Sequence, residues 1–455
     1  MSDVYDVVIL GGGSAGYATA LRCAQLGLSV TLIEADKLGG TCLHRGCIPT
    51  KALLQAAATA DTVRDAAGFG IGAELTGIDP AAMLGWSDQV VGRLHSGLTG
   101  LFSAARIPVV HATGRLSTQP LGIQTDDGVI EGRSVVLATG ATPVTLGLPV
   151  DGQRILTSEH ALRLTELPER AIVLGGGVIG VEFASAWASL GVDVTIVEAL
   201  DRLVPAEEPE ISAALLRAFR QRGIKVRLNI RLTSADADDQ RVAVTLGDDH
   251  LDTDVLLVAV GRRADPDAAG APDLLVRPDL STNIPGVYAI GDLAPGPQLA
   301  HRGYVQGYYI AETIAHRQGK HPTAPRRPDD ALMPRVTYSN PEIVSVGLTA
   351  AQASAQGEIE TMEYQLTGNG KAQIFAGSSR VRGSVKVIRR TNGAIVGVHI
   401  VGEHVAELVG EANLLVNWAA EPADLDGIAH AHPTLGEAIG EVVLALAGKP
   451  LHMHP

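Results

Sequence analysis

Apolar and polar positions near the N-terminus follow a strand, turn, helix, strand order. Residues 5–10 (YDVVIL) form a continuous apolar run of the length of a buried strand, and residues 29–33 (SVTLI) predict a second strand. Between them lie a glycine-rich turn at 11–16 and an alanine-rich stretch that predicts a helix. Short strands that alternate with helices are typical of α/β proteins with parallel sheets. The pattern therefore predicts an α/β fold at the start of the chain.

The glycines in this turn are spaced as GxGxxG. Gly11, Gly13 and Gly16 stand between the first strand and the helix, and Glu34 ends the second strand. In this context glycines permit a tight turn and the close approach of a pyrophosphate, which rests on the helix N-terminus. An acid at the end of the second strand accepts hydrogen bonds from a ribose. We therefore expect a dinucleotide to bind here.

The same signal recurs 164 residues later, from Gly11 to Gly175 and from Glu34 to Glu198. Residues 24–35 (AQLGLSVTLIEA) align with residues 188–199 (ASLGVDVTIVEA) without a gap. A single GxGxxG is a weak signal, but two in register, each with its strand, helix and acid, are specific. The sequence predicts two dinucleotide sites, which suits a flavin and a hydride carrier.

The second site favours NAD over NADP. Glu198 is followed by Ala199 and Leu200 rather than by arginines. A carboxylate at this position repels a 2′-phosphate, whereas an arginine accommodates it. Arg202 is the nearby basic residue that leaves NADP open as an alternative.

Composition narrows the class of protein. The 455 residues correspond to about three domains, at roughly 150 residues each. A net charge of −14 disfavours nucleic-acid binding. No apolar run approaches the ~18 residues of a membrane span. Three cysteines are too few for a secreted disulfide scaffold, so we expect a cytoplasmic protein.

Two of the three cysteines lie close together in GGTCLHRGCIPTK, residues 39–51. A zinc site needs about four ligands, and no second cysteine pair exists, so we expect no metal. A structural disulfide is disfavoured in a reducing compartment. On a regular helix, five residues rise by about 7.5 Å. Because a disulfide spans at most ~6.8 Å between Cα atoms, Cys42 and Cys47 could bridge only where the helix is interrupted, which Gly46 and Pro49 would permit.

This cysteine segment resembles the active-site segment of the flavin-dependent pyridine nucleotide–disulfide oxidoreductases, and among them that of the dihydrolipoamide dehydrogenases. The resemblance covers nearly the whole chain. Further segments that are similar to this family are ATGATP at 138–143, AVGRRADP at 259–266, VYAIGDLAPGPQLAHRG at 287–303, YSNPEIVSVGLT at 338–349 and HAHPTLGE at 430–437.

The resemblance implies different roles for the two sulfurs. Cys47 would exchange electrons with the flavin, and Cys42 would meet the substrate. His432 would act as the acid–base, oriented by Glu437, and both would come from the partner subunit of a homodimer. A thiolate needs a partner that takes and returns its proton, and a histidine beside a carboxylate suits that task near neutral pH. A turn before a helix is the expected setting for this pair.

The resemblance also implies the cofactor contacts. Lys51 would lie near the flavin and pair with Glu182, and Asp292 would bind the flavin ribitol. The other residues implied to contact FAD are Gly11, Gly13, Ser14, Gly16, Glu34, Gly40, Thr41, Gly114, Thr139, Gly140 and Ala300. Those implied to contact NAD are Gly175, Gly177, Val178, Ile179, Gly180, Glu198 and Gly261.

The implied activity is the reoxidation of dihydrolipoyl groups to lipoyl disulfides, with reduction of NAD to NADH. The implied partners are lipoyl domains of 2-oxo-acid dehydrogenase complexes, without nucleic acid or membrane. The alternatives are an NAD(P)H-dependent reductase of another low-molecular-weight disulfide and a non-catalytic flavoprotein redox sensor. The complete set of cysteines, histidine and glutamate argues against the sensor.

The expected architecture is α/β, with two Rossmann-like dinucleotide-binding domains and an α+β dimerisation domain at the C-terminus. Stretches rich in proline, glycine and charge near 142–152, 261–273 and 316–330 indicate linkers. We expect an FAD-binding domain at 1–148, an NAD-binding domain at 149–267, a return segment to the FAD domain at 268–330 and the dimerisation domain at 331–455.

Overall fold

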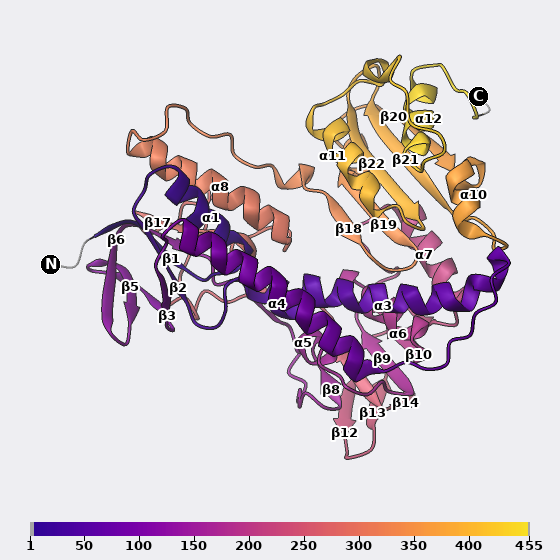
Figure 1. The fold of residues 1–455 in the computed structure, drawn as a ribbon, viewed down its shortest axis with the longest axis horizontal. Coiled ribbons are helices and arrows are strands. Elements are labelled where there is room, and N and C mark those ends of the chain that lie inside the picture. The colour runs from indigo at the N-terminus through magenta and orange to yellow at the C-terminus, as the bar shows by residue number, and fades with distance from the viewer. Residues whose placement is uncertain (1–3, 454–455) are drawn as a thin grey trace. The chain divides into compact units, whose positions relative to one another are not determined.

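The structure is a computed structural model that describes residues 4–453, and it contains two compact units. The first unit combines the chain up to Thr50 with residues 84–144 and 262–330. The second combines residues 51–83, residues 145–261 and the chain from Ala331 onward. Figure 1 follows the chain through both units by colour. The predicted division at 148, 267 and 330 stays a prediction.

The first unit is built on one sheet with strand order β3-β2-β1-β6-β5-β4, to which β17 adds beside β6. Strands β1, β2, β3, β6 and β17 pair in parallel, whereas β4 and β5 form an antiparallel hairpin beside β6. The bounds are β1 Tyr5–Leu10, β2 Val30–Glu34, β3 Val109–His111, β4 Arg115–Thr118, β5 Leu121–Thr125, β6 Gly128–Leu137 and β17 Val287–Ala289. The predicted first strand coincides with β1, and β2 begins one residue later than predicted and ends at the acid, as predicted.

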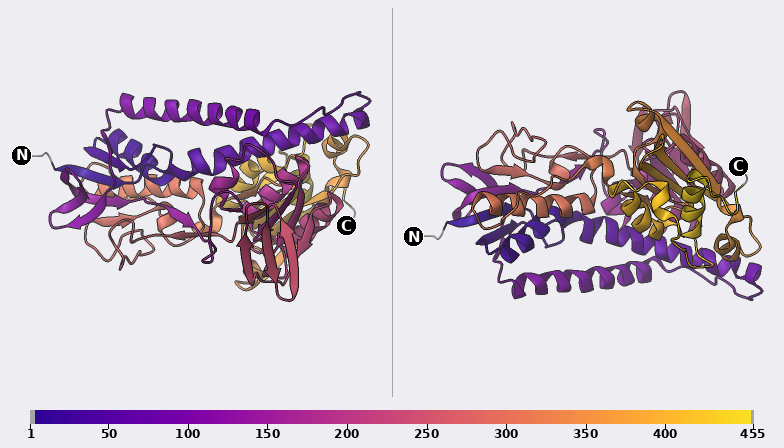
Figure 2. Two further views of the ribbon diagram at one scale, coloured as in Figure 1. Left: turned by 90° about the horizontal axis from the view of Figure 1, so that it is seen from below. Right: turned by 90° about the horizontal axis from the view of Figure 1, so that it is seen from above.

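Helices α1 (Ser14–Gln25) and α8 (Ala300–Arg317) lie side by side in this unit (Figures 1 and 2). Small residues allow their close contact. A Cβ on Gly307 would lie 2.8 Å from Ala15 O, and a Cβ on Gly303 would lie 3.2 Å from Ala15 Cβ. Because neither glycine has a side chain, the helix that begins at the first glycine turn packs directly on α8.

The chain leaves the first unit and returns to it through two short paired strands. Strand β7 (Ala141–Pro143) and strand β16 (Arg262–Ala264) run antiparallel, with Thr142 opposite Arg263. Arg262 also donates a hydrogen bond to Ala141 O. The two crossings are thus tied together next to the segments that the sequence indicates as linkers.

The second unit contains a parallel five-stranded sheet in the order β11-β10-β9-β15-β8. Two of its central strands, β9 and β15, consist of buried apolar residues apart from Arg170 at the start of β9. Such strands are typical of parallel sheets that are covered on both faces. Helices α6 (Val178–Ser189) and α7 (Pro209–Gln221) pack on this sheet and share its apolar core. The strand bounds are β8 Ile155–Leu156, β9 Arg170–Leu174, β10 Asp193–Val197, β11 Lys225–Arg227 and β15 Val255–Val258.

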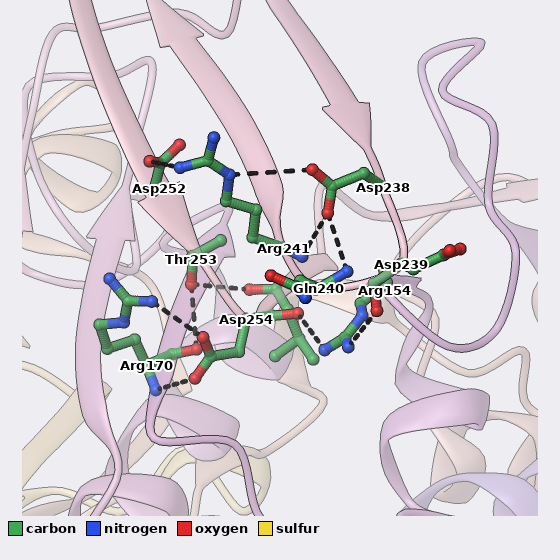
Figure 3. A network of polar contacts seen from close by, with 10 residues as sticks. Arg154, Arg170, Asp238, Asp239, Gln240, Arg241, Asp252, Thr253 and Asp254 are labelled. Atoms are coloured by element: carbon green, nitrogen blue, oxygen red, sulfur yellow. Dashed lines mark hydrogen bonds and ion pairs between the residues drawn. The ribbon is translucent and has the colours of Figure 1, made fainter.

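A three-stranded antiparallel meander adjoins this sheet, formed by β12 (Ser234–Ala237), β13 (Val242–Leu246) and β14 (Asp249–Thr253). Figure 3 shows the polar contacts where it meets the sheet. The Asp254 carboxylate accepts hydrogen bonds from the backbone N–H of Arg170, at 2.9 Å, and from its guanidinium, at 3.0 Å. Because Asp254 follows β14 directly and Arg170 begins β9, this pair fixes the register between the meander and the sheet.

An antiparallel five-stranded sheet, in the order β18-β19-β22-β21-β20, makes up the C-terminal part of the second unit (Figure 1). Helices α11 (Val409–Asn417) and α12 (Glu437–Leu446) share its apolar core. This arrangement is the α+β region that the sequence predicts. The strand bounds are β18 Arg335–Thr337, β19 Glu342–Gly347, β20 Ile359–Gln365, β21 Gly383–Arg390 and β22 Ile395–Gly402.

Helix α3 (Cys47–Asp65) carries the lysine of the cysteine segment to helix α6. Its residue Ala57 is buried together with Ala186 and Leu190. Among residues 4–453, no helix combines the length and the apolar composition needed to cross a membrane.

Candidate active site

The two glycine turns have nearly the same geometry. Gly11 and Gly175 have φ angles of +102° and +109°, in the region that favours glycine. A Cβ on Gly16 would lie 1.8 Å from Gly11 O, and a Cβ on Gly180 would lie 1.9 Å from Gly175 O. Only glycine fits at these positions, because each helix starts directly against its turn. The first backbone N–H groups of α1 and α6 are therefore available to a phosphate.

The two acids at the strand ends are held in the same way. Glu34 accepts hydrogen bonds from the backbone N–H groups of Gly12, at 2.6 Å, and Asp36, at 2.8 Å. Glu198 accepts them from Gly176, at 2.6 Å, and Leu200, at 2.7 Å. Each carboxylate thus uses one lone pair per oxygen and keeps acceptor capacity for a ribose. The structure brings each acid to the glycine turn that the fingerprint requires.

Polar groups of the first unit fit a bound flavin nucleotide. The Thr139 hydroxyl is buried without a hydrogen-bond partner among residues 4–453. Burial raises the pKa of Asp292, against the opposing effect of Arg262 and Arg302. A Cβ on Gly114 would lie 2.5 Å from an Ile123 methyl group, so only glycine fits there. Buried polar groups without protein partners are expected where a polar ligand supplies them.

The remaining cofactor candidates occupy turns and helix starts. Gly40 has a φ of +56° and approaches Gly13, to whose Cα an added Cβ would be 2.7 Å away. Thr41 follows it in helix α2 (Gly40–Arg45), Ala300 is the first residue of α8, and Val178 is that of α6. Ile179 is the second residue of α6, and Gly140 and Gly261 have φ angles of +80° and +116°.

The cysteine pair spans an interruption between two helices. Helix α2 ends at Arg45, Gly46 adopts φ −142° and ψ −111°, and α3 begins at Cys47. The interrupted helix that a Cys42–Cys47 bridge requires is therefore present, and Gly46 is the residue that breaks it. In the structure both residues are thiols in hydrogen-bond contact.

The environment of Cys42 disfavours its thiolate. The hydrogen bond with Cys47 and then burial raise the pKa of the Cys42 thiol, against a hydrogen bond from the Ser14 side chain. Because the thiolate is the reactive form, this pair needs a base from outside its own segment. The third cysteine, Cys23, is fully buried, and burial raises its pKa to about 12, so it behaves as the predicted small apolar core residue.

Lys51 and Glu182 meet in the second unit. The Lys51 ammonium donates hydrogen bonds to both carboxylate oxygens of Glu182, at 3.0 and 2.9 Å. Glu182 is 3% exposed and also accepts a hydrogen bond from the backbone N–H of Tyr338. Lys51 lies one turn after Cys47 in α3, so the helix that starts at the second cysteine also carries the partner of a buried carboxylate.

His432 and Glu437 form the expected pair at the start of α12. The His432 Nδ1 atom lies 2.8 Å from Glu437 Oε1, and the backbone N–H of Thr434 donates to Glu437 Oε2. Burial favours the neutral carboxyl, but the hydrogen bonds from Thr434 and His432 lower the pKa of Glu437. The His432 side chain is 78% exposed, so its Nε2 faces outward from its own chain.

The sequence interpretation missed two groups. Tyr17 of α1 contacts Tyr304 of α8, with ring centroids 5.6 Å apart, and burial followed by the hydrogen bond with Tyr304 raises the pKa of Tyr17. His430 contacts Glu411 at 2.7 Å. The spacing of residues along one helix gives no sign of a contact between α1 and α8. For His430 a signal was present, because two histidines stand close together in HAHP at 430–433.

Comparisons with known proteins agree with this geometry. The family model "Pyridine nucleotide-disulphide oxidoreductase" matches residues 5–307, and its "dimerisation domain" matches residues 333–443. The dihydrolipoyl dehydrogenase of Bacillus subtilis (strain 168) is 36% identical, over 99% of this chain and 100% of its own. The mitochondrial dihydrolipoyl dehydrogenase of Pisum sativum is 35% identical, over 99% and 93%. The crystal structure of LpdA from Mycobacterium tuberculosis covers 97% of this chain and 100% of its own, with a TM-score of 0.86 and 26% identity.

These matches confirm a flavoprotein oxidoreductase that uses FAD and NAD, as the two glycine turns predict. The dimerisation domain and the relatives indicate a homodimer. Both family models together span most of the chain, and the relatives match it nearly from end to end. The chain belongs to the pyridine nucleotide–disulphide oxidoreductase family.

Proposed function

We propose that the protein oxidises dihydrolipoyl groups to lipoyl disulfides and reduces NAD to NADH. One observation carries the proposal: Cys42 and Cys47 meet across the helix interruption at Gly46, in a chain whose whole-length relatives include dihydrolipoyl dehydrogenases. His432, held by Glu437, would supply the base that the cysteine environment lacks. In the homodimer, we propose that His432 and Glu437 complete the site of the partner subunit.

The chemistry begins with the pair oxidised. His432 takes the proton of a substrate thiol, and the resulting thiolate attacks the Cys42 sulfur. A mixed disulfide forms, and Cys47 leaves as a thiolate. The second substrate thiolate then attacks the substrate sulfur of the mixed disulfide, which closes the lipoyl ring and releases Cys42. The proton of the second substrate thiol passes to the leaving Cys42 sulfur, and His432 keeps the first proton. The substrate has then lost two electrons to the cysteine pair and two protons, one to Cys42 and one to His432.

FAD, when bound, supplies the two-electron transfer between the cysteine pair and NAD. We propose that the first unit holds FAD through the N-terminus of α1, the carboxylate of Glu34 and the buried Thr139 and Asp292 groups. The second unit would hold NAD through the N-terminus of α6 and Glu198. Lys51 would lie on the flavin side of α3, with its charge balanced by Glu182.

We propose lipoyl domains of 2-oxo-acid dehydrogenase complexes as macromolecular partners and the cytoplasm as the location. The relatives' names support a lipoyl substrate. The location is supported by the thiol chemistry, because a chain with three cysteines lacks the disulfide framework of a secreted protein. The rival activity is reduction of another small disulfide by NADPH or NADH, and the rival of a different class is a redox sensor without turnover.

The deciding experiment measures NADH formation from NAD and dihydrolipoamide with the purified flavoprotein. NADPH and NADH oxidation with glutathione disulfide is measured in parallel. We expect fast, NAD-dependent oxidation of dihydrolipoamide and little glutathione reduction. Preferential turnover of glutathione disulfide would support the rival reductase. A flavin-loaded protein with neither activity would support the sensor.

A further inference from the structure

A second histidine–carboxylate pair lies next to the catalytic one. His430 Nε2 lies 2.7 Å from Glu411 Oε1, and their side chains are 19% and 33% exposed. His432, two residues later, is 78% exposed. The contact with Glu411 joins the segment that carries His432 to helix α11.

Two glycines of the following segment make room for the His430 ring. A Cβ on Gly440 would lie 2.5 Å from His430 Nδ1 and 2.7 Å from its Cε1. A Cβ on Gly436 would lie 3.6 Å from His430 Cδ2 and 3.6 Å from Glu411 Oε2. The ring therefore packs on α12 where that helix begins, while its Nε2 reaches α11. Glu437, whose carboxylate holds His432, stands between these two glycines at the start of α12.

Carboxylates near the two pairs act on His430 and on its neighbours. The hydrogen bond with Glu411 raises the pKa of His430, against burial, and Glu437 acts in the same direction. His430 and His432 are among the groups that lower the pKa of Glu437. Burial, followed by Glu441 and Glu437, raises the pKa of Tyr364 on β20, so that neighbour stays neutral. The contact with Glu411 thus favours the protonated form of His430.

We propose that His430 and Glu411 are positioning residues for His432 and Glu437. They fix the loop between α11 and α12, and His430, when protonated, balances the Glu411 carboxylate beside the acid–base group. The inference rests on the proposed role of His432. It differs from a packing role, because it requires the removal of each partner to shift the pH dependence of the active site in opposite directions.

The test uses the flavoprotein dimer reduced by one equivalent of NADH, and measures the rate of Cys42 alkylation by iodoacetamide against pH. H430Q leaves the Glu411 carboxylate unbalanced, so the midpoint of the profile should rise. E411Q leaves an unbalanced His430 cation, so the midpoint should fall. At the pH of the wild-type midpoint, H430Q should therefore react more slowly than wild type and E411Q faster. The double variant H430Q/E411Q should return to the wild-type midpoint.

Further variants separate position from charge. Gly440→Ala displaces the ring without changing any charge, and should lower the plateau rate at an unchanged midpoint. It also keeps the test informative if H430Q does not fold. His452→Gln is the matched control, because it removes another histidine contact to α12, at 2.7 Å from Glu441. It should leave the midpoint in place.

The inference would be overturned if the midpoints of H430Q and E411Q shifted in the same direction, or if neither midpoint changed. A shift in H452Q as large as in H430Q would also overturn it, because the effect would then follow net charge alone. Wild-type protein that fails to oxidise dihydrolipoamide but keeps a pH-dependent alkylation profile would refute the substrate assignment and leave this test readable.

Discussion

Both carboxylate oxygens of Glu182 accept hydrogen bonds from Lys51, at 3.0 and 2.9 Å, across 131 residues of sequence. The lysine lies one turn into α3, directly after the cysteine pair, and the glutamate lies in the helix that follows the second glycine turn. Within the second unit, Lys51 thus anchors its part of α3 to the helix whose N-terminus is expected to bind NAD.

Lys51→Met should lower the free energy of unfolding by about 2–3 kcal/mol. The variant leaves the buried Glu182 carboxylate with one backbone partner, whereas the partial exposure of Lys51 keeps the loss near the low end for such pairs. Denaturant unfolding of wild type and variant measures the difference.

A double variant, K51M/E182Q, is the control for this prediction. Removing both charges should recover part of the loss, because no unpaired charge remains buried. An equal or larger loss in the double variant would show that packing around α3, rather than the ion pair, carries the stability.

Cys42→Ser and Cys47→Ser should each abolish oxidation of dihydrolipoamide while FAD stays bound. Neither hydroxyl can form the disulfide, and the glycine turn and Asp292 are untouched. Flavin absorbance of the desalted protein and NADH formation measure the two properties. The Cys23→Ser variant is the control, because it removes a thiol of the first unit that is fully buried and takes no part in the proposed disulfide. Turnover by C42S at the wild-type rate would refute the role of Cys42.

His432→Gln should lower kcat for dihydrolipoamide by about 10²–10⁴, the usual contribution of a positioned acid–base group. Glu437→Gln keeps the histidine but removes the carboxylate that holds Nδ1 at 2.8 Å, so a smaller loss is expected. Steady-state kinetics across pH distinguish the two. Equal losses with an unchanged pH profile would indicate that both residues act on folding of the loop.

Local patterns predicted the glycine turns and the acids that follow them, because their chemistry depends on residues close in sequence. Gly11 and Gly175 have the expected positive φ, and Glu34 and Glu198 bind the turns that they follow. The break at Gly46 lies at one of the two residues that the sequence indicated as permitting an interruption between Cys42 and Cys47.

Long-range contacts needed the structure. Nothing near Lys51 in sequence indicates Glu182, and only the family resemblance paired them. The contact between Tyr17 and Tyr304 depends on how α1 packs on α8, and that packing follows from glycines of α8 whose spacing carries no chemical signature. For the same reason His430 was passed over, since its partner Glu411 belongs to another helix.

Asp254→Asn should destabilise the meander by about 1–2 kcal/mol at neutral pH. Burial favours the neutral Asp254 carboxyl, but the backbone N–H and the guanidinium of Arg170 lower its pKa below 3.8 (Figure 3). A group with a lowered pKa in the folded state stabilises the fold above its unfolded pKa, and this contribution is lost as the pH falls through the folded value. The difference between wild type and D254N should therefore be constant above about pH 5 and shrink below 3.8. Hydrogen exchange of the β14 amides over this pH range measures the difference in stability. The control is Asp248→Asn, which changes an exposed carboxylate near the meander. A difference that persists at the lowest pH would show that the contact depends on side-chain packing and not on charge.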